Sequence, residues 1–349
     1  GVRVRALGGE AMRAAGAELV FPLAARGLMG VAEAARGLGF LRQAMTALRA
    51  EVQAHPPRVA VLMDFGGFNL QAAAVIRKLS PATRVLYWIP PKVWVWGAWR
   101  TRSLRRVTHR VLSIFPFEHE FLAARGVNSE FVGHPLPELL HGEPGDAGFA
   151  AKYRVRDDRP PLLLLPGSRS SEWERLLPVL LAAAVQVQQR LPCTIWLAPA
   201  PTLPRAWLAE QLARCPVAVQ IVEERYAAMR HARVALAASG TVTLELMLQQ
   251  TPTVIAYRMA PVTFFLARRL VRVGYAGLPN LLAGRELMPE LLQRECTPEK
   301  LAAAAAELWS DERQQAVRRE CVRLAELVGG TDGISRAAGS IVRDYQEQR

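Results

Sequence analysis

The chain has 349 residues, of which 51% are hydrophobic and 21% are charged. This length suggests two domains of ordinary size, and the composition excludes a disordered or collagen-like chain. The four cysteines lie far apart, without CxxC or metal-ligand spacing, which argues against a disulfide scaffold and a zinc site. No apolar run approaches the roughly 18 to 20 residues that a membrane-spanning helix needs.

The formal net charge is +13 and is unevenly distributed. Lys and Arg exceed Asp and Glu by nine in residues 1–140 and by four in the remainder. The densest basic cluster consists of Arg100, Arg102, Arg105, Arg106 and Arg110. A basic face suits nucleic acid, anionic lipid headgroups or phosphorylated substrates, and it is equally typical of a solvated helix surface. Charge alone leaves these functions open.

Short β-rich runs alternate with helical stretches. In chain order, strands are expected at residues 59–63, 85–89 and 110–114, with helices at about 70–79 and 118–125. A Gly/Pro/Asp-rich stretch, 142–158, then interrupts the alternation. Beyond it, strands are expected at 162–165, 194–198, 218–222, 233–237 and 254–257, and the chain from Pro298 onward is helical in pattern.

Alternation of this kind predicts parallel sheets. We therefore expect an α/β fold made of two Rossmann-like, doubly wound domains with a cleft between them and a helical C-terminal tail. The first domain is expected at residues 1–138 and the second at 139–330. The last helix, 331–349, is expected to pack back on the first domain.

Two turns in the second half follow predicted strands and open helices. One contains Gly167, Ser168 and Arg169, and the other contains Ser239, Gly240 and Thr241. A small glycine, a hydroxyl and a helix N-terminus can cradle an anion, and a guanidinium can bind phosphate oxygens through two hydrogen bonds. The alternatives are an ordinary loop at the first turn and a capping box at the second. Two cradles in one domain indicate a diphosphate, hence a nucleotide.

Three further carboxylate and amide positions are candidates. Glu245 lies one turn into the second helix, where it can accept hydrogen bonds from the hydroxyls of a ribose. Asp64 ends a buried strand and is placed to act as a general base on a hydroxyl nucleophile, or else to cap the next helix. Asn69 either orients Asp64 or serves as a cap.

Two loops combine apolar and polar residues. In the loop from Leu278 to Glu286, Asn280 and Arg285 can offer an amide and a guanidinium to phosphate or sugar. Four tryptophans gather between Trp88 and Trp99, a pattern that suits base stacking, a lipid-facing surface or plain core packing. The apolar, glycine-rich Met29-Gly30 segment suits acyl-chain contacts or a core helix.

These segments, taken in order, resemble the lipid-A-disaccharide synthase family, inverting glycosyltransferases with the two-domain GT-B fold. The matching motifs are LMGVAE (28–33), the strand into Asp64 with Phe68-Asn69, PKVWVW (91–96), FPFEHEF (115–121), FVGHPL (131–136), LLPGSR (164–169), ASGTVTLE (238–245), YRMAPVTFFLARRLV (257–271) and LPNLLAGRELMPELLQ (278–293).

The resemblance implies a reaction and a set of roles. UDP-2,3-diacylglucosamine would donate its sugar to the 6-hydroxyl of 2,3-diacylglucosamine 1-phosphate, releasing UDP, with Asp64 as general base. Donor binding would fall to Gly167, Ser168, Arg169, Ser239, Gly240, Thr241, Glu245, Asn280 and Arg285. No metal or other cofactor is implied, and nucleic acid is not an expected partner. The implied location is the cytoplasm, peripheral on the inner face of the bacterial inner membrane, with a homodimer left open.

The chain departs from the family pattern at three places. The family's first strand and its helix are expected to be missing from this sequence. Gly67 stands where the family has a second Asp, and Pro90-Pro91-Lys92 replaces the usual Ser-Pro-Ser. The alternatives are another UDP-sugar transferase or epimerase of the same fold, and a basic membrane- or nucleic-acid-binding module.

Overall fold

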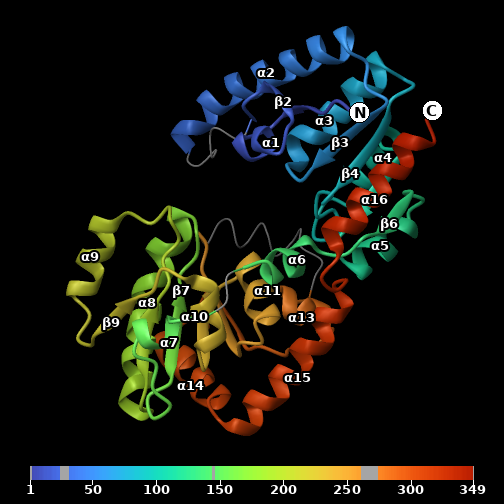
Figure 1. The fold of residues 1–349 in the computed structure, drawn as a ribbon. Helices are drawn as coiled ribbons and strands as arrows, with labels where there is room; N and C mark the ends of the chain where they lie inside the picture. The colour runs from blue at the N-terminus through green and yellow to red at the C-terminus, as the bar shows by residue number, and fades with distance from the viewer. Residues whose placement is uncertain (1, 24–30, 144–145, 261–273, 349) are drawn as a thin grey trace. The chain divides into compact units, whose positions relative to one another are not determined.

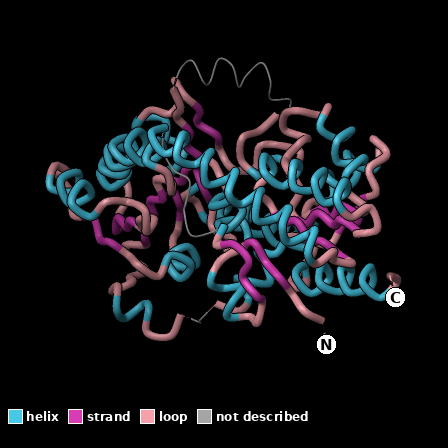
Figure 2. The backbone as a smooth tube through the Cα atoms, turned by 90° about the horizontal axis from the view of Figure 1, so that it is seen from above, coloured by secondary structure: helices cyan, strands magenta, loops and turns pink. Residues whose placement is uncertain are grey.

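The computed structural model describes residues 2–23, 31–143, 146–260 and 274–348 (Figure 1). The chain forms two compact units. Unit 1 contains Gly1–Pro135 together with Asp332–Arg349, and unit 2 contains Leu136–Thr331. Figure 2 colours the strands magenta and the helices cyan, and in each unit helices flank the strands. No helix in the described ranges is both long and apolar enough to cross a bilayer.

Unit 1 has two parallel sheets. The smaller pairs β1 (Arg5–Leu7) with β2 (Glu18–Phe21). The larger has the order β3-β4-β5-β6, formed by β3 (Val59–Met63), β4 (Arg84–Trp88), β5 (Arg110–Ser113) and β6 (Ser129–Phe131). All of its neighbouring strands are parallel, so their carboxyl ends lie along one edge.

The helices of unit 1 are α1 (Glu10–Ala14), α2 (Val31–Ala54), α3 (Gly66–Leu79), α4 (Arg100–Val107), α5 (Pro116–Ala123) and the C-terminal α16 (Gly333–Gln346). α3 buries Phe68, Ala72 and Ile76, whose spacing of about one turn forms a single apolar face toward the core. α16 contacts β3 and β4, and its Ala337 joins a buried cluster with Leu112 and Val132.

Unit 2 is one six-stranded, fully parallel sheet in the order β12-β11-β10-β7-β8-β9. The strands are β7 (Pro161–Leu165), β8 (Thr194–Leu197), β9 (Val219–Ile221), β10 (Val234–Ala238), β11 (Thr253–Tyr257) and β12 (Glu290–Leu292). Every residue of the central β7 and β10 is buried, as expected for strands covered on both faces.

The helices around this sheet are α6 (Pro135–His141), α7 (Phe149–Lys152), α8 (Ser170–Arg190), α9 (Arg205–Ala213), α10 (Arg225–His231), α11 (Thr241–Leu248), α13 (Leu278–Ala283), α14 (Pro298–Leu308) and α15 (Asp311–Leu327). α8 and α14 pack side by side against the sheet.

The predicted α/β class with parallel sheets and a helical C-terminal end is confirmed. Each strand expected from the sequence is present, with bounds within one residue of the prediction. The short strands β1, β2, β6 and β12 were not predicted, since three or four residues carry too little alternation to stand out.

Candidate active site

A strained turn after β3 carries Asp64. Asp64 and Phe65 both have positive φ, 47° and 45°, a conformation that costs a residue with a Cβ on the order of 1–3 kcal/mol. The Asn69 amide donates hydrogen bonds to the carbonyl oxygens of Met63 (2.9 Å) and Asp64 (2.8 Å). The Tyr87 hydroxyl donates to the same Asp64 carbonyl at 2.7 Å. These bonds hold the Asp64 backbone in place while its side chain stays exposed.

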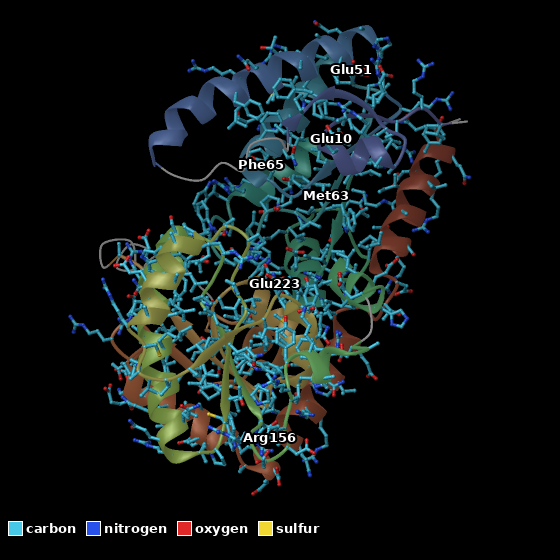
Figure 3. The ribbon with its side chains drawn as sticks, turned by 60° about the vertical axis from the view of Figure 1, so that its left-hand side comes forward. Glu10, Glu51, Met63, Phe65, Arg156 and Glu223 are labelled. Carbon is cyan, nitrogen blue, oxygen red and sulfur yellow. The ribbon has the colours of Figure 1, made fainter. Side chains whose placement is uncertain are left out.

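Asn69 therefore holds the backbone of the turn. Met63 and Phe65, the residues before and after Asp64 in the sequence, are labelled in Figure 3, and both side chains are exposed at this end of β3. Gly66 is required next in the turn because a Cβ there would lie 2.6 Å from Cβ of Pro91. The turn after β3 thus touches the loop after β4.

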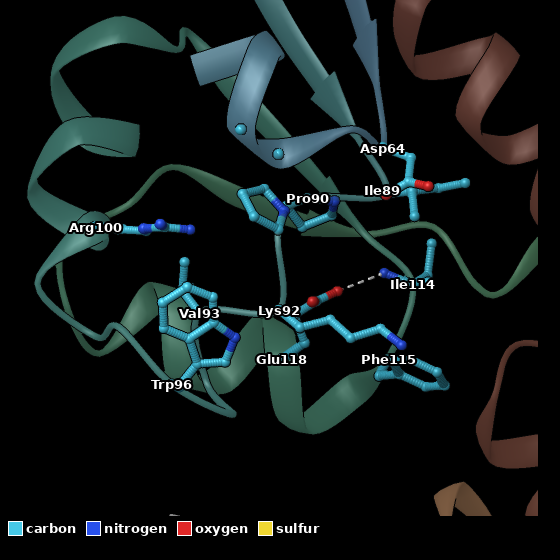
Figure 4. Close-up of a pocket in the computed structure, with 13 residues that line it drawn as sticks. Asp64, Ile89, Pro90, Lys92, Val93, Trp96, Arg100, Ile114, Phe115 and Glu118 are labelled. Atoms are coloured by element: carbon cyan, nitrogen blue, oxygen red, sulfur yellow. Dashed lines mark hydrogen bonds between the residues drawn. The ribbon is translucent and has the colours of Figure 1, made fainter. Parts of the chain in front are cut away.

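A pocket of about 280 Å³ opens beside Asp64 within unit 1 (Figure 4). Its walls come from the carboxyl ends of three neighbouring strands: the turn after β3, the loop after β4 with the start of α4, and the β5–α5 connection. Ile89, which follows β4 in the wall, also has positive φ, 54°. Strain at two adjacent strand ends is typical of a functional site, because packing alone gives no reason to retain it.

Glu118 is a buried carboxyl in the wall of this pocket. Its side chain is 1% exposed and accepts hydrogen bonds from the Trp94 indole (3.0 Å) and the backbone N–H of Ile114 (3.1 Å). Burial raises the pKa of Glu118 to about 7, although both hydrogen bonds and the Lys92 charge act in the opposite direction. Sequence reasoning did not single out Glu118, because nothing in its sequence context indicates that it is buried.

The tryptophan cluster separates into two environments. Trp94 is buried and packs edge-on against Phe117 with ring centroids 4.8 Å apart. Trp96 and Trp99 are 43% and 63% exposed and form an edge-on pair at 6.4 Å. Core packing thus accounts for Trp94, whereas Trp96 and Trp99 give unit 1 an exposed aromatic surface.

In unit 2, both predicted anion turns lie at the same edge of the sheet. β7 and β10 are adjacent and parallel, with Leu165 in register with Ala237. A Cβ on Gly167 would lie 3.4 Å from Cβ of Ala238, the last residue of β10, so the first turn lies beside the strand end that the second turn follows. Gly167 itself has φ +107°, which explains the glycine.

The first turn already holds an anion from its own chain. One Glu172 oxygen accepts from the backbone N–H groups of Ser168 (3.0 Å) and Arg169 (3.3 Å), and the other accepts from the Arg169 guanidinium at 2.7 Å. These N–H donors therefore already bind an anionic group, and a phosphate could take the place of the Glu172 carboxylate. Glu172 was not predicted, although its position one turn into α8 is a capping signal.

The second turn begins α11. Ser239 donates its hydroxyl to the Ala276 carbonyl at 2.9 Å, so it links this turn to the loop before α13. Gly240 is the N-cap and has no side-chain cap hydrogen bond, and Thr241 is exposed as the first helical residue. Glu245 is mostly buried, and its carboxylate pairs with Arg225, the first residue of α10, which sequence reasoning missed.

The two candidate residues of the α13 loop, Asn280 and Arg285, differ in burial. Asn280 is fully buried; its amide donates to the Met288 carbonyl (2.7 Å) and to Glu290 (2.8 Å), and its oxygen accepts from the N–H groups of Leu287 and Met288. In this structure Asn280 fixes the loop beside Ser239. Arg285 is exposed and lies 3.6 Å from Glu320.

Some expectations fall on residues outside the described ranges. The acyl-contact segment Met29-Gly30 and residues 261–273 of the YRMAPVTFFLARRLV motif are among them. Within the described ranges, no three or more His, Cys, Asp or Glu side chains are grouped to hold a metal ion.

Solved structures of low sequence identity share the fold. The glycotransferase of kitacinnamycin matches with a TM-score of 0.62 at 18% identity, covering 98% of this chain and 92% of its own. The UDP-GlcNAc 2-epimerase from Neisseria meningitidis bound to UDP-GlcNAc matches with a TM-score of 0.64 at 9% identity, covering 94% and 86%. The two parallel α/β units therefore have the GT-B fold, which this glycotransferase and this epimerase share.

Sequence comparison identifies the family. Residues 1–338 match the family described as lipid-A-disaccharide synthetase. The lipid-A-disaccharide synthase of Alkalilimnicola ehrlichii is 40% identical over 344 residues, covering 95% of this chain and 88% of the relative. That of Trichlorobacter lovleyi is 35% identical over 339 residues, covering 96% and 88%. The chain belongs to the lipid-A-disaccharide synthetase family.

Proposed function

We propose that this enzyme transfers 2,3-diacylglucosamine from its UDP donor to the 6-hydroxyl of 2,3-diacylglucosamine 1-phosphate and releases UDP. Membership of the lipid-A-disaccharide synthetase family carries the reaction class. The observation that supports the donor site is the position of the turns after β7 and β10 on adjacent parallel strands, which places two sets of candidate anion-binding donors at one sheet edge. Their separation on opposite edges would have left no place for a diphosphate.

In the proposed step, Asp64 accepts the proton of the acceptor hydroxyl as its oxygen attacks the anomeric carbon of the donor. The bond from that carbon to the phosphate oxygen breaks, and UDP leaves with the electron pair. Asp64 suits a base because its carboxylate is exposed on a backbone that hydrogen bonds hold rigidly. The configuration at the anomeric carbon is inverted because attack and departure occur on opposite faces.

The leaving diphosphate gains charge, which the turns of unit 2 are suited to stabilise. The proposed donors are the Arg169 guanidinium, the backbone N–H groups of Ser168 and Arg169, and the N-terminus of α11 at Gly240 and Thr241. Glu245 would accept the ribose hydroxyls from its place beside Arg225, and Arg285 would add a further cation. Asn280 contributes as a positioning residue. No step requires a metal ion.

The proposed location is the membrane surface. Both sugars carry acyl chains, and unit 1 combines exposed Trp96 and Trp99 with the arginines of α4. Aromatic and basic side chains together favour the interface of an anionic bilayer.

A UDP-release assay with diacylated donor and acceptor tests the proposal. Release must require both substrates and must leave a disaccharide as product. Release without acceptor, or interconversion of the donor sugar without a new glycosidic bond, would instead favour a hydrolase or an epimerase of the same fold.

A further inference from the structure

The pocket beside Asp64 contains two cations that the reaction as described does not use. Lys92, in the loop after β4, and Arg100, the first residue of α4, both line it. Among the described residues, neither is within ion-pair distance of a carboxylate, whereas Arg84 and Arg110 of the same unit are both paired. Two unpaired cations in one pocket point to an anionic ligand.

The surroundings hold the side chain of Arg100 and the backbone of Lys92. The Arg100 guanidinium lies over the Trp96 ring, 4.5 Å from its centroid, and this cation–π contact keeps the guanidinium beside the pocket. Lys92 follows Pro90 and Pro91, which restrict the backbone. Its carbonyl accepts a hydrogen bond from the Val95 N–H at 3.1 Å. In Figure 4, Arg100 and Lys92 reach the pocket from different elements, with the Glu118 carboxyl between them.

The other acids of the pocket limit what the anion is. Asp64 lies on the side of the pocket away from Arg100 (Figure 4), so one ligand can present a hydroxyl to Asp64 and its charge to the cations. Burial raises the pKa of Glu118 to about 7, so near neutral pH about half of these carboxyls are protonated and their average repulsion of an anion is reduced. The volume, about 280 Å³, is at the small end of ligand sites and suits a sugar phosphate without its acyl chains.

We propose that Lys92 and Arg100 bind the phosphate monoester of the acceptor sugar and thereby place its hydroxyl at Asp64. The planar guanidinium of Arg100 can donate two hydrogen bonds to phosphate oxygens, and the flexible side chain of Lys92 supplies a second positive charge. This inference rests on the proposed function, since it names the subsite that recognises the acceptor. It makes both residues specificity determinants that distinguish phosphorylated from unphosphorylated acceptors.

The test compares two acceptors, 2,3-diacylglucosamine 1-phosphate and the same sugar without phosphate, in the UDP-release assay. Lys92→Ala and Arg100→Ala are each expected to raise the acceptor KM about tenfold or more for the phosphorylated sugar only, leaving the donor KM unchanged. Lys92→Arg keeps the charge and is expected to retain most of the preference. Arg49→Ala removes an exposed arginine of α2 in the same unit that does not line the pocket, and it serves as the matched control.

Three results would overturn the subsite. The variants could affect both acceptors equally, they could leave the acceptor KM unchanged, or they could weaken binding only to phosphatidylglycerol vesicles relative to phosphatidylcholine vesicles. The third result would show that Lys92 and Arg100 bind the membrane surface and not the acceptor phosphate. If the wild-type chain releases no UDP with either acceptor, the proposed function fails. The subsite is then decided by titrating glucosamine 1-phosphate into wild type and variants by NMR: weaker binding in both Ala variants supports it, and equal binding refutes it.

Discussion

The carboxylate of Asp344 on α16 lies 3.0 Å from the guanidinium of Arg84 on β4, joining two residues 260 positions apart in the sequence. Asp344 is completely buried, and its second oxygen lies 3.0 Å from Nε of Arg110 on β5. The carboxylate therefore bridges two neighbouring strands. This contact explains why the last helix of the chain belongs to unit 1.

Asp344→Ala is expected to destabilise unit 1 by about 2–3 kcal/mol, because it removes the buried carboxylate that Arg84 and Arg110 share and leaves each with one partly exposed partner, Glu347 or Glu130. Denaturant unfolding followed by a probe in unit 1 measures the change. Glu347→Ala is the control: Glu347 also pairs with Arg84 but is exposed, so its loss is expected to have no measurable effect. Equal stability of Asp344→Ala and wild type would show that the buried ion pair contributes nothing.

Gly333→Ala is expected to disturb the start of α16. A Cβ at Gly333 would lie 2.6 Å from the carbonyl oxygen of His134, a backbone atom that cannot move aside easily. The expected cost is about 1–3 kcal/mol of overpacking. Gly339→Ala, later in the same helix, meets only the tip of Arg343 at 3.8 Å, and it is expected to be neutral or stabilising because alanine favours a helix interior. The same denaturation experiment compares both variants, and a Gly333→Ala variant as stable as Gly339→Ala would exclude the clash.

The fold was predictable where the chain buries strands on both faces. Runs such as Leu162–Leu165 are continuous apolar stretches between turn residues, and β7 proved to be buried throughout. Such stretches fix a parallel strand without any knowledge of its partner. The pairing order of the sheets, by contrast, depends on which strand lies beside which, and no local pattern encodes it.

The candidate site was predictable only in part, for the same reason. Position after a strand was enough to select Asp64 and the turns near Gly167 and Ser239. Arg225 was missed because its ion pair with Glu245 is visible only once two separate helices are placed together. Glu172 was missed although it lies three residues from Arg169, where a capping signal was available. Asn280 was a candidate to contact phosphate or sugar, but in the structure its side chain is fully buried, which its sequence context did not indicate.

Asp64→Asn is expected to reduce kcat for transfer by a factor of about 10²–10⁴, the usual contribution of a general base. An amide keeps the shape of the side chain but cannot take a proton. UDP binding is expected to stay intact, since the proposed phosphate donors belong to unit 2. Steady-state rates and UDP titration measure the two quantities separately. A parallel loss of UDP affinity would contradict the role assigned to Asp64, and Asp157→Asn provides a control at an exposed carboxylate elsewhere.

Arg169→Ala is expected to weaken UDP binding by about 1.5–3 kcal/mol, the contribution of a hydrogen bond to a charged group, and to lower turnover with it. The reason is loss of the guanidinium that now bonds to Glu172 and that a diphosphate would attract away from it. Calorimetric titration of UDP gives the affinity. Arg175→Ala, an exposed arginine on the same helix, is the matched control. Unchanged UDP affinity in Arg169→Ala would remove the first turn from the donor site.

Glu118 is expected to make the stability of unit 1 depend on pH. Its folded pKa of about 7 exceeds its ordinary value of 4.5, so the folded chain binds a proton more tightly than the unfolded chain does. That proton stabilises the fold below pH 4.5, and the stabilisation is lost as pH rises through 7. Between pH 5 and 8 the loss is about 2–3 kcal/mol for a shift of this size.

Comparison with Glu118→Gln isolates this contribution, because the amide does not titrate. His134, whose pKa burial lowers to about 4, opposes Glu118 at the acidic end of this range, but it is present in both proteins and cancels in the difference. Lys92, Arg100 and Asp64, which line the same pocket, are also common to both. The amide faces the Ile114 N–H less favourably than a carboxylate, so the variant is expected to be less stable overall but to lose less stability from pH 5 to 8. Parallel stability curves for the two proteins would mean that Glu118 keeps an ordinary pKa despite its burial.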